Sequence, residues 1–173
     1  MEPIKFDNVE PVLSGTKTGT WRMIKPQPRR VHKAEVTWYC FDEKGHGSIL
    51  EPKYKPGEVY PIVQTDDTPG ELECEKRLGA EPYSLGNGAW QAYLNSLPHV
   101  KIISATPVQV KDITEEMAEK AGHENRYERS YEDNICMERC DEAYRNELHG
   151  IYPDLTGETW GWWYDLELAK EGS

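Results

Sequence analysis

The apolar residues of the chain fall mostly in short runs that are bounded by proline, glycine and charged residues. Short runs that are rich in β-branched and aromatic residues are typical of strands. The clearest run is 160–168, where alternate positions place Trp162, Tyr164, Leu166 and Leu168 on one face. Further strands are predicted over residues 3–7, 20–25, 35–41, 59–63, 102–103 and 108–110.

Apolar spacings of three and four residues predict helices in four places. A short helix is expected over residues 9–14, with Asn8 as a candidate N-cap and Gly15 just beyond its end. Thr114 is the candidate N-cap of a later helix that ends at Gly122. That helix is predicted over residues 114–121. The remaining two helical stretches are predicted over residues 90–97 and, as a charged segment with an apolar stripe, 123–148.

The mixture of short strands and short helices predicts an α+β fold. A length of 173 residues fits a single domain over residues 1–173. Two polar segments, at about 65–98 and 123–148, interrupt the strand pattern and are predicted to be inserts. No apolar run approaches the roughly 20 residues of a membrane span, and the first residues lack the basic and apolar regions of a secretory signal. We therefore expect a cytoplasmic protein with no membrane partner.

The net charge of −11 is unevenly distributed along the chain. Residues 1–33 carry seven basic and three acidic side chains, so the acidic excess lies in the remainder. A uniformly acidic protein repels nucleic acid, whereas a local basic segment can still contact phosphate groups. For the acidic remainder, solubility is the simplest interpretation. The candidate nucleic-acid contacts are Lys25, Arg29, Arg30 and Lys33.

Residues 15–22 combine a flexible backbone with three side chains that can hold a polar ligand. Two glycines bracket Lys17, and glycine lets the backbone turn sharply or approach a ligand closely. In the strand that follows, Thr20 and Arg22 lie on one face, because alternate residues of a strand point the same way. Lys17 has a stem long enough to reach that face. The segment therefore predicts an amine, a hydroxyl and a guanidinium at one site.

Gly15, Lys17, Thr20 and Arg22 match the G-x-K-x-x-T-x-R signature of the ASCH family, whose members are small barrels with a PUA-like fold. The flanking sequence resembles phage-type members over about two thirds of the chain, in order. The resemblance implies an α+β fold built on a PUA-like mixed β-barrel, with short flanking helices and a helical insert. A phage-encoded member would be located in the host cytoplasm. The similar flanking segments are 3–6, 24–28, 54–58, 112–116 and 160–167.

The resemblance also implies a ligand site at the signature. The ligand would be a nucleotide, a modified nucleoside or RNA. Trp21 offers an aromatic face on which a base can stack; the alternative for Trp21, as for Trp38 and Trp163, is packing in the core. The expected ligand-binding residues are Gly15, Lys17, Thr20, Trp21, Arg22 and Gln64.

One branch of small ASCH proteins hydrolyses the acetyl amide of acetylcytidine, and there the signature lysine and threonine act with a glutamate. By this resemblance Lys17 and Thr20 would be the catalytic residues. The position of the glutamate falls at Ala121, and a second carboxylate position of phage members falls at Gln64. Neither residue can exchange a proton, so hydrolysis is expected to be slow or absent. The nearest substitute carboxylates, on other helix faces, are Glu119 and Glu124.

Three functions remain open at this point. The preferred one is binding of a nucleotide or RNA-like ligand at the signature cleft. The second is amide hydrolysis on an acetylated or otherwise modified cytidine. The third is that of an acidic phage protein that imitates nucleic acid and inhibits a host protein through acidic residues such as Glu71, Glu73 and Glu75.

The chain has four cysteines, of which Cys136 and Cys140 are one helical turn apart. This spacing can supply two metal ligands, but structural zinc sites usually use closer pairs, and no second pair is present. Small apolar residues on a helix face are the better interpretation. We expect no metal site and no cofactor.

Overall fold

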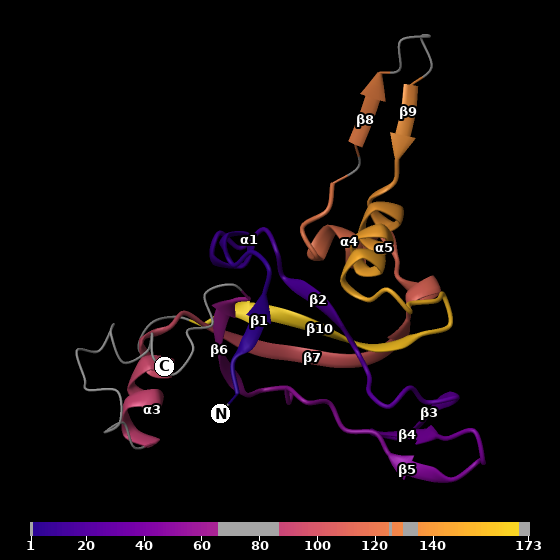
Figure 1. Ribbon diagram of the computed structural model, residues 1–173, viewed down its shortest axis with the longest axis horizontal. Coiled ribbons are helices and arrows are strands. Elements are labelled where there is room, and N and C mark those ends of the chain that lie inside the picture. The colour runs from indigo at the N-terminus through magenta and orange to yellow at the C-terminus, as the bar shows by residue number, and fades with distance from the viewer. Residues whose placement is uncertain (1, 66–86, 125, 130–134, 170–173) are drawn as a thin grey trace.

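The computed structural model describes residues 2–65, 87–124, 126–129 and 135–169, and it has the mixed α+β composition that the sequence predicts (Figure 1). Its main element is a five-stranded sheet in the order β1-β6-β7-β10-β2. β1 runs parallel to β6, and the other neighbouring pairs are antiparallel. The strands are β1 (Ile4–Phe6), β2 (Gly19–Met23), β6 (Val59–Gln64), β7 (His99–Gln109) and β10 (Trp160–Leu168).

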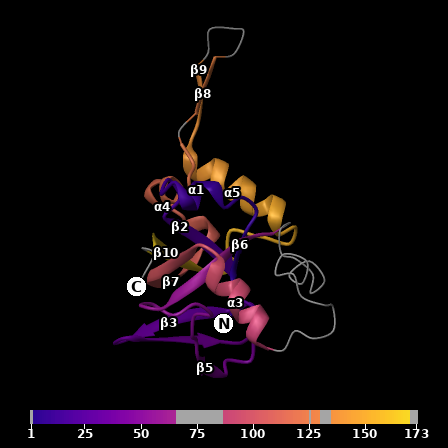
Figure 2. The ribbon, with the colours of Figure 1, turned by 90° about the vertical axis from the view of Figure 1, so that its left-hand side faces the viewer.

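Two smaller antiparallel sheets accompany the main one. The first has the order β3-β4-β5 and lies on the side of the main sheet opposite to the helices α4 and α5 in both ribbon views (Figures 1 and 2). The second is the hairpin of β8 and β9, which extends away from the body (Figure 1). Their strands are β3 (Arg30–Ala34), β4 (Thr37–Phe41), β5 (Gly47–Ile49), β8 (Arg126–Arg129) and β9 (Ile135–Glu138).

The helices are short and begin and end close to the predicted signals. Thr114 Oγ1 accepts a hydrogen bond of 3.3 Å from the backbone N–H of Met117, and Gly122, with φ of +92°, follows the same helix. None of the helices in the described part of the chain is both long and apolar enough to span a membrane. The helices are α1 (Glu10–Leu13), α3 (Asn87–Ser96), the 3₁₀ turn η1 (Val110–Asp112), α4 (Glu115–Lys120) and α5 (Cys140–Ile151).

The five-stranded sheet does not close into a barrel within the described residues, so the prediction of a closed β-barrel is wrong. Its edge strands are β1 and β2, and a side chain rather than a backbone ladder connects them: the Arg22 guanidinium donates to the carbonyl of Lys5. The free edge of β2 is occupied instead by α5. The backbone N–H of Trp21 donates a 2.9 Å hydrogen bond to the hydroxyl of Tyr144, and a helix that covers an edge in this way blocks further strand pairing.

Within its described residues, 123–124, 126–129 and 135–148, the segment predicted as a mostly helical insert is helical only from Cys140 onward. Residues Arg126–Arg129 pair with Ile135–Glu138 as β8 and β9, and α5 starts at Cys140. A short apolar run such as 135–137 fits a strand as well as a helix, because its length does not separate the two periods. The apolar stripe therefore spans a hairpin and a helix.

Two apolar clusters pack against opposite faces of the main sheet. Alternate residues of β10 divide between them: Trp162 and Tyr164 lie in the first cluster, with apolar side chains of α1, and Trp163 lies in the second. The second cluster also holds Trp21 of β2 and Tyr144 of α5. α4 and α5 therefore cover one face of the sheet through aromatic packing.

Two tryptophans of the second cluster lie directly over glycines of the neighbouring strand. Trp21 and Trp163 are cross-strand partners in the β2–β10 register. A Cβ atom on Gly161 would be 2.0 Å from Trp21 Cε2, and one on Gly19 would be 2.2 Å from Trp163 Cζ2. Each indole therefore occupies the space that a side chain would need, and both tryptophans are 2% exposed.

We expect Gly161→Ala to destabilise the protein, because the added methyl group overlaps the buried indole of Trp21. Overpacking of a core costs about 1–3 kcal/mol, so urea unfolding should show a fall of that size in the free energy of unfolding. The matched control is Gly150→Ala in α5, where a Cβ atom meets nothing within 4 Å. That change should be neutral or stabilising by up to about 1 kcal/mol. Equal stabilities for the two variants would contradict the packing described.

Candidate functional site

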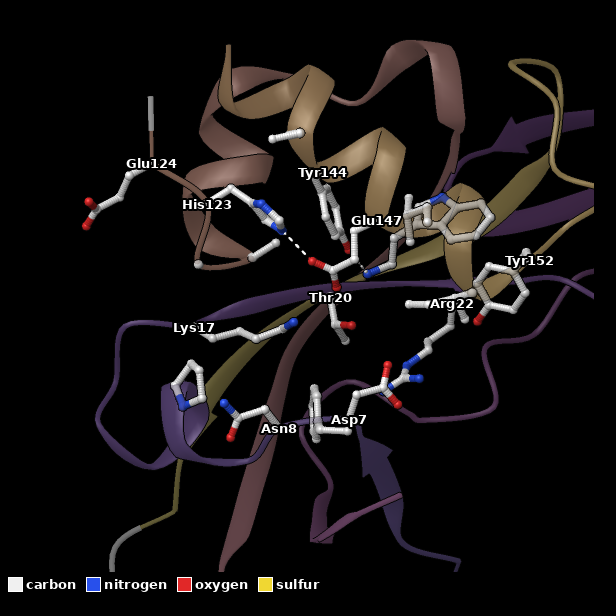
Figure 3. Close-up of a pocket in the computed structure, with 18 residues that line it drawn as sticks. Asp7, Asn8, Lys17, Thr20, Arg22, His123, Glu124, Tyr144, Glu147 and Tyr152 are labelled. Carbon is white, nitrogen blue, oxygen red and sulfur yellow. Dashed lines mark hydrogen bonds and ion pairs between the residues drawn. The ribbon is translucent and has the colours of Figure 1, made fainter. Parts of the chain in front are cut away.

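A cavity of about 540 Å³ opens between the two edges of the main sheet and α5 (Figure 3). Phe6 and Asp7 line it from the end of β1, and Thr20 and Arg22 line it from β2. The remaining wall comes from α1, from the residues that follow α4 and from α5. The cavity thus lies between the edge strands β1 and β2, which would pair with each other if the sheet closed into a barrel.

Backbone hydrogen bonds hold the signature loop between three elements. The N–H of Lys17 donates to the carbonyl of Pro11 at 2.8 Å, which ties the loop to α1. The N–H of Thr18 donates to the carbonyl of Lys120 at 2.7 Å, and the carbonyl of Thr18 accepts from Leu166 at 2.7 Å. Gly15, with φ of +76°, makes the turn that starts the loop. These contacts direct the side chain of Lys17 into the cavity (Figure 3).

The Lys17 amine lies in a partly apolar environment. Its Nζ is 5.8 Å from the centre of the Phe6 ring. Burial lowers the pKa of Lys17 below its ordinary value; the Glu147 carboxylate opposes this shift, and the Arg22 guanidinium adds to it. Such an amine releases its proton more readily than a lysine in water, which suits it to proton transfer.

Glu147 supplies a carboxylate opposite Lys17 (Figure 3). Its Oε2 lies 2.8 Å from Nε2 of His123, the residue after Gly122 at the end of α4. The hydrogen bond with His123 is the main reason why the pKa of Glu147 is lowered, and the charge of Lys17 adds to the effect. The carboxylate is therefore ionised at neutral pH and stabilises positive charge in the cavity.

Tyr144 connects the cavity to the buried backbone. Its hydroxyl accepts the N–H of Trp21 and also forms a hydrogen bond with Thr20, which is 5% exposed. Burial raises the pKa of Tyr144, so its hydroxyl stays protonated. The phenol therefore fixes the position of Thr20 without adding charge.

Arg22 completes the site from β2. Its guanidinium carbon lies 5.2 Å from the centre of the Phe6 ring, and one of its terminal nitrogens donates to the Lys5 carbonyl. The Nε–H group is buried and has no hydrogen-bond partner among the described residues. A buried donor without an acceptor costs about 1–3 kcal/mol, so an oxygen atom placed beside it would be stabilised.

The structure brings together some of the residues that the sequence singles out. Lys17, Thr20 and Arg22 line one cavity, as do Ala121, which is 3% exposed, and the exposed Glu124. Trp21 also borders it, but its indole is buried, and Nε1 donates a 3.0 Å hydrogen bond to the carbonyl of Val108. A stacking role for Trp21 therefore does not fit its packing.

Other candidate residues lie elsewhere. Gly15 acts only through the turn, Gln64 ends β6 beside Phe6, and Glu119 is exposed on α4; none of the three lines the cavity. The acidic stretch of Glu71, Glu73 and Glu75 and the side chain of Cys136 are outside the part of the chain that is described. The candidate nucleic-acid contacts, which are exposed and also do not line the cavity, are Lys25, Arg29, Arg30 and Lys33.

Sequence reasoning missed Glu147, His123 and Tyr144. Tyr144 was assigned to an apolar packing stripe, and Glu147 was one of many charged residues in a polar segment. A usable signal was present, because residues three apart on a helix share a face. A helix that buries Tyr144 therefore carries Glu147 towards the same strand.

The chain has no match among the protein-family models, the curated proteins or the solved structures with which it was compared. The resemblance to the ASCH family therefore stays a prediction from the signature and its flanks.

The environment of Lys17 predicts a pH titration that depends on Glu147. By NMR of the lysine side-chain signals, the Lys17 midpoint should lie below the value of about 10.4 that is usual for lysine. Glu147→Gln should lower it further, because the carboxylate is the main group that raises the pKa of Lys17. Glu124→Gln, at a second cavity-lining glutamate, is the control and should leave the midpoint unchanged. An unchanged or higher midpoint in Glu147→Gln would refute the pairing.

Proposed function

We propose that the cavity binds a nucleotide or a modified nucleoside, free or as part of an RNA. The observation that carries this proposal is the convergence of Lys17, Thr20 and Arg22 on one cavity beside the Glu147 carboxylate. Cavities of about 300–1,000 Å³ are typical of small-molecule sites. The cationic groups suit phosphate or carbonyl oxygens, and the carboxylate suits the amino and hydroxyl donors of a nucleoside.

The signature supports the same proposal. We infer that the chain is an ASCH-type module and that its five-stranded sheet is a relative of the PUA-like barrel that stays open between β1 and β2. In this interpretation the open edge serves as the entrance for the ligand. The unpartnered Nε–H of Arg22 favours a ligand that presents an oxygen atom there.

Calorimetric titration with cytidine 5′-monophosphate and with N4-acetylcytidine tests the proposal. Lys17→Met keeps the length of the side chain but removes its charge. Hydrogen bonds to charged groups contribute about 1.5–3 kcal/mol, so binding should weaken by roughly 10- to 150-fold. Lys25→Met, at an exposed lysine outside the cavity, should bind as the wild type does. Equal affinities for both variants, or no binding of either ligand at about 50 mM salt, would exclude this function.

A second candidate function, amide hydrolysis on an acetylated cytidine, is favoured by one observation. The missing carboxylates at Ala121 and Gln64 argued against it, but Glu147 now supplies a carboxylate next to Lys17 and Thr20. In this reaction the neutral amine of Lys17 takes a proton from water while the water oxygen adds to the amide carbonyl. The hydroxyl of Thr20 and the guanidinium of Arg22 donate to the developing oxyanion. The proton then passes to the leaving amine, which gives acetate and cytidine.

Release of acetate from N4-acetylcytidine, followed by chromatography, tests this second function. We expect measurable turnover in the wild type and its loss in Lys17→Met. The loss in Lys17→Met should be about 10²–10⁴-fold, the usual contribution of general acid–base help, whereas Glu124→Gln, at an exposed glutamate, should retain the rate. Tight binding of N4-acetylcytidine without release of acetate would exclude hydrolysis, and ligand binding would remain as the proposed function.

A further inference from the structure

The three-stranded sheet β3-β4-β5 is attached to the body through one face. Trp38 of β4 packs against the first apolar cluster, and so does Leu50 just after β5. Because successive side chains of a strand point to opposite sides, Tyr39 and Phe41 point away from that cluster. None of the residues of these three strands is fully buried. The side of the sheet that faces away from this cluster is here called the outer face, and among the described residues no element packs over it.

The strand register places two rows of side chains across the outer face. In one row His32 of β3 is opposite Tyr39 of β4, which is opposite Ile49 of β5. In the other row Arg30, Phe41 and Gly47 follow in the same order. A Cβ atom on Gly47 would be 3.0 Å from Phe41 Cε1, so the phenyl ring lies over this glycine. The result is a basic edge on β3, two aromatic rings in the middle and an aliphatic side chain on β5.

The charges around the outer face favour an anionic partner. Arg30 and His32 lie on the outer face along β3, and both side chains are exposed. Acidic side chains are present in the turns that join the strands, at Glu35, Asp42 and Glu43. Asp42 is held there, since its Oδ1 accepts the N–H groups of Lys44 and His46 and its Oδ2 lies 3.2 Å from the His46 ring.

We propose that the outer face binds single-stranded nucleic acid, with bases stacked on Tyr39 and Phe41 and phosphates beside Arg30 and His32. Aromatic rings in line with a basic edge are the arrangement that holds unpaired bases without base-specific contacts. The surface is separate from the cavity: the residues of the two rows do not line it, and the small sheet lies across the main sheet from α5, which forms part of the cavity wall (Figures 1 and 2). This binding does not depend on the function proposed for the cavity.

Fluorescence anisotropy with a labelled RNA of about 12 nucleotides tests the proposal. All variants carry Lys17→Met as well, so that binding at the cavity does not contribute. Tyr39→Leu should weaken binding by about 5- to 150-fold, the loss expected for one stacked base. Tyr39→Phe keeps the ring and should bind as the parent does. Loss of binding in both variants, or in neither, would overturn the proposal.

A second pair of variants separates the two faces of the same strand. Arg30→Gln and Lys33→Gln remove one charge each from β3, but Lys33 lies on the inner side, with its Nζ 5.3 Å from the centre of the Trp38 ring. Arg30→Gln should flatten the dependence of log affinity on log salt by about 0.7, the value for one phosphate contact, and Lys33→Gln should flatten it less. Equal salt dependences for Arg30→Gln and Lys33→Gln would show that the phosphates do not contact the outer face. No RNA binding by the parent variant at about 50 mM salt would refute the proposal. The partner of the outer face would then be a protein.

Discussion

The free edge of β2 is the constraint on which the cavity beside α5 depends. In the described part of the chain β2 pairs with β10 alone, so the backbone groups on its other side need partners. Tyr144 provides one by accepting the N–H of Trp21, and this contact seats α5 on the strand. Once α5 is there, the residue three positions further, Glu147, faces the signature loop. The need of the Trp21 N–H for a partner thus helps to place the carboxylate of Glu147, which lies beside His123, in the cavity.

Charge in the cavity is balanced by groups from distant parts of the chain. Lys17 and Arg22 come from the signature, whereas Glu147 and His123 flank the β8–β9 hairpin. Burial disfavours the Lys17 ammonium and the carboxylate favours it, so its protonation responds to any ligand that changes either effect. The outer face of the small sheet has a different character, with the exposed Arg30 and His32 beside aromatic rings and no acidic residue within the rows. The chain therefore carries two chemically distinct surfaces.

Much of the local structure could be predicted from the sequence, because it depends on nearby residues. The alternation in β10, the Thr114 cap and the glycine turns all follow from short-range patterns. The open edge between β1 and β2 could not be predicted from the sequence, because the contact that spans it joins the Arg22 side chain to the distant Lys5 carbonyl. Glu147 was missed for a similar reason: its role depends on the charge of Lys17, which is far away in the sequence. Trp21 was ambiguous because a tryptophan suits a core as well as a ligand site.

The central position of β10 also affects the order in which the protein can fold. β10 lies between β7 and β2, and it is the strand with which β2 pairs in the described residues. During synthesis the signature strand is made early, but it has no partner until residues 160–168 leave the ribosome. Contacts of such long sequence separation form slowly, because the loop between them must first be closed. The cavity can therefore be completed only after β10 has paired with both β7 and β2.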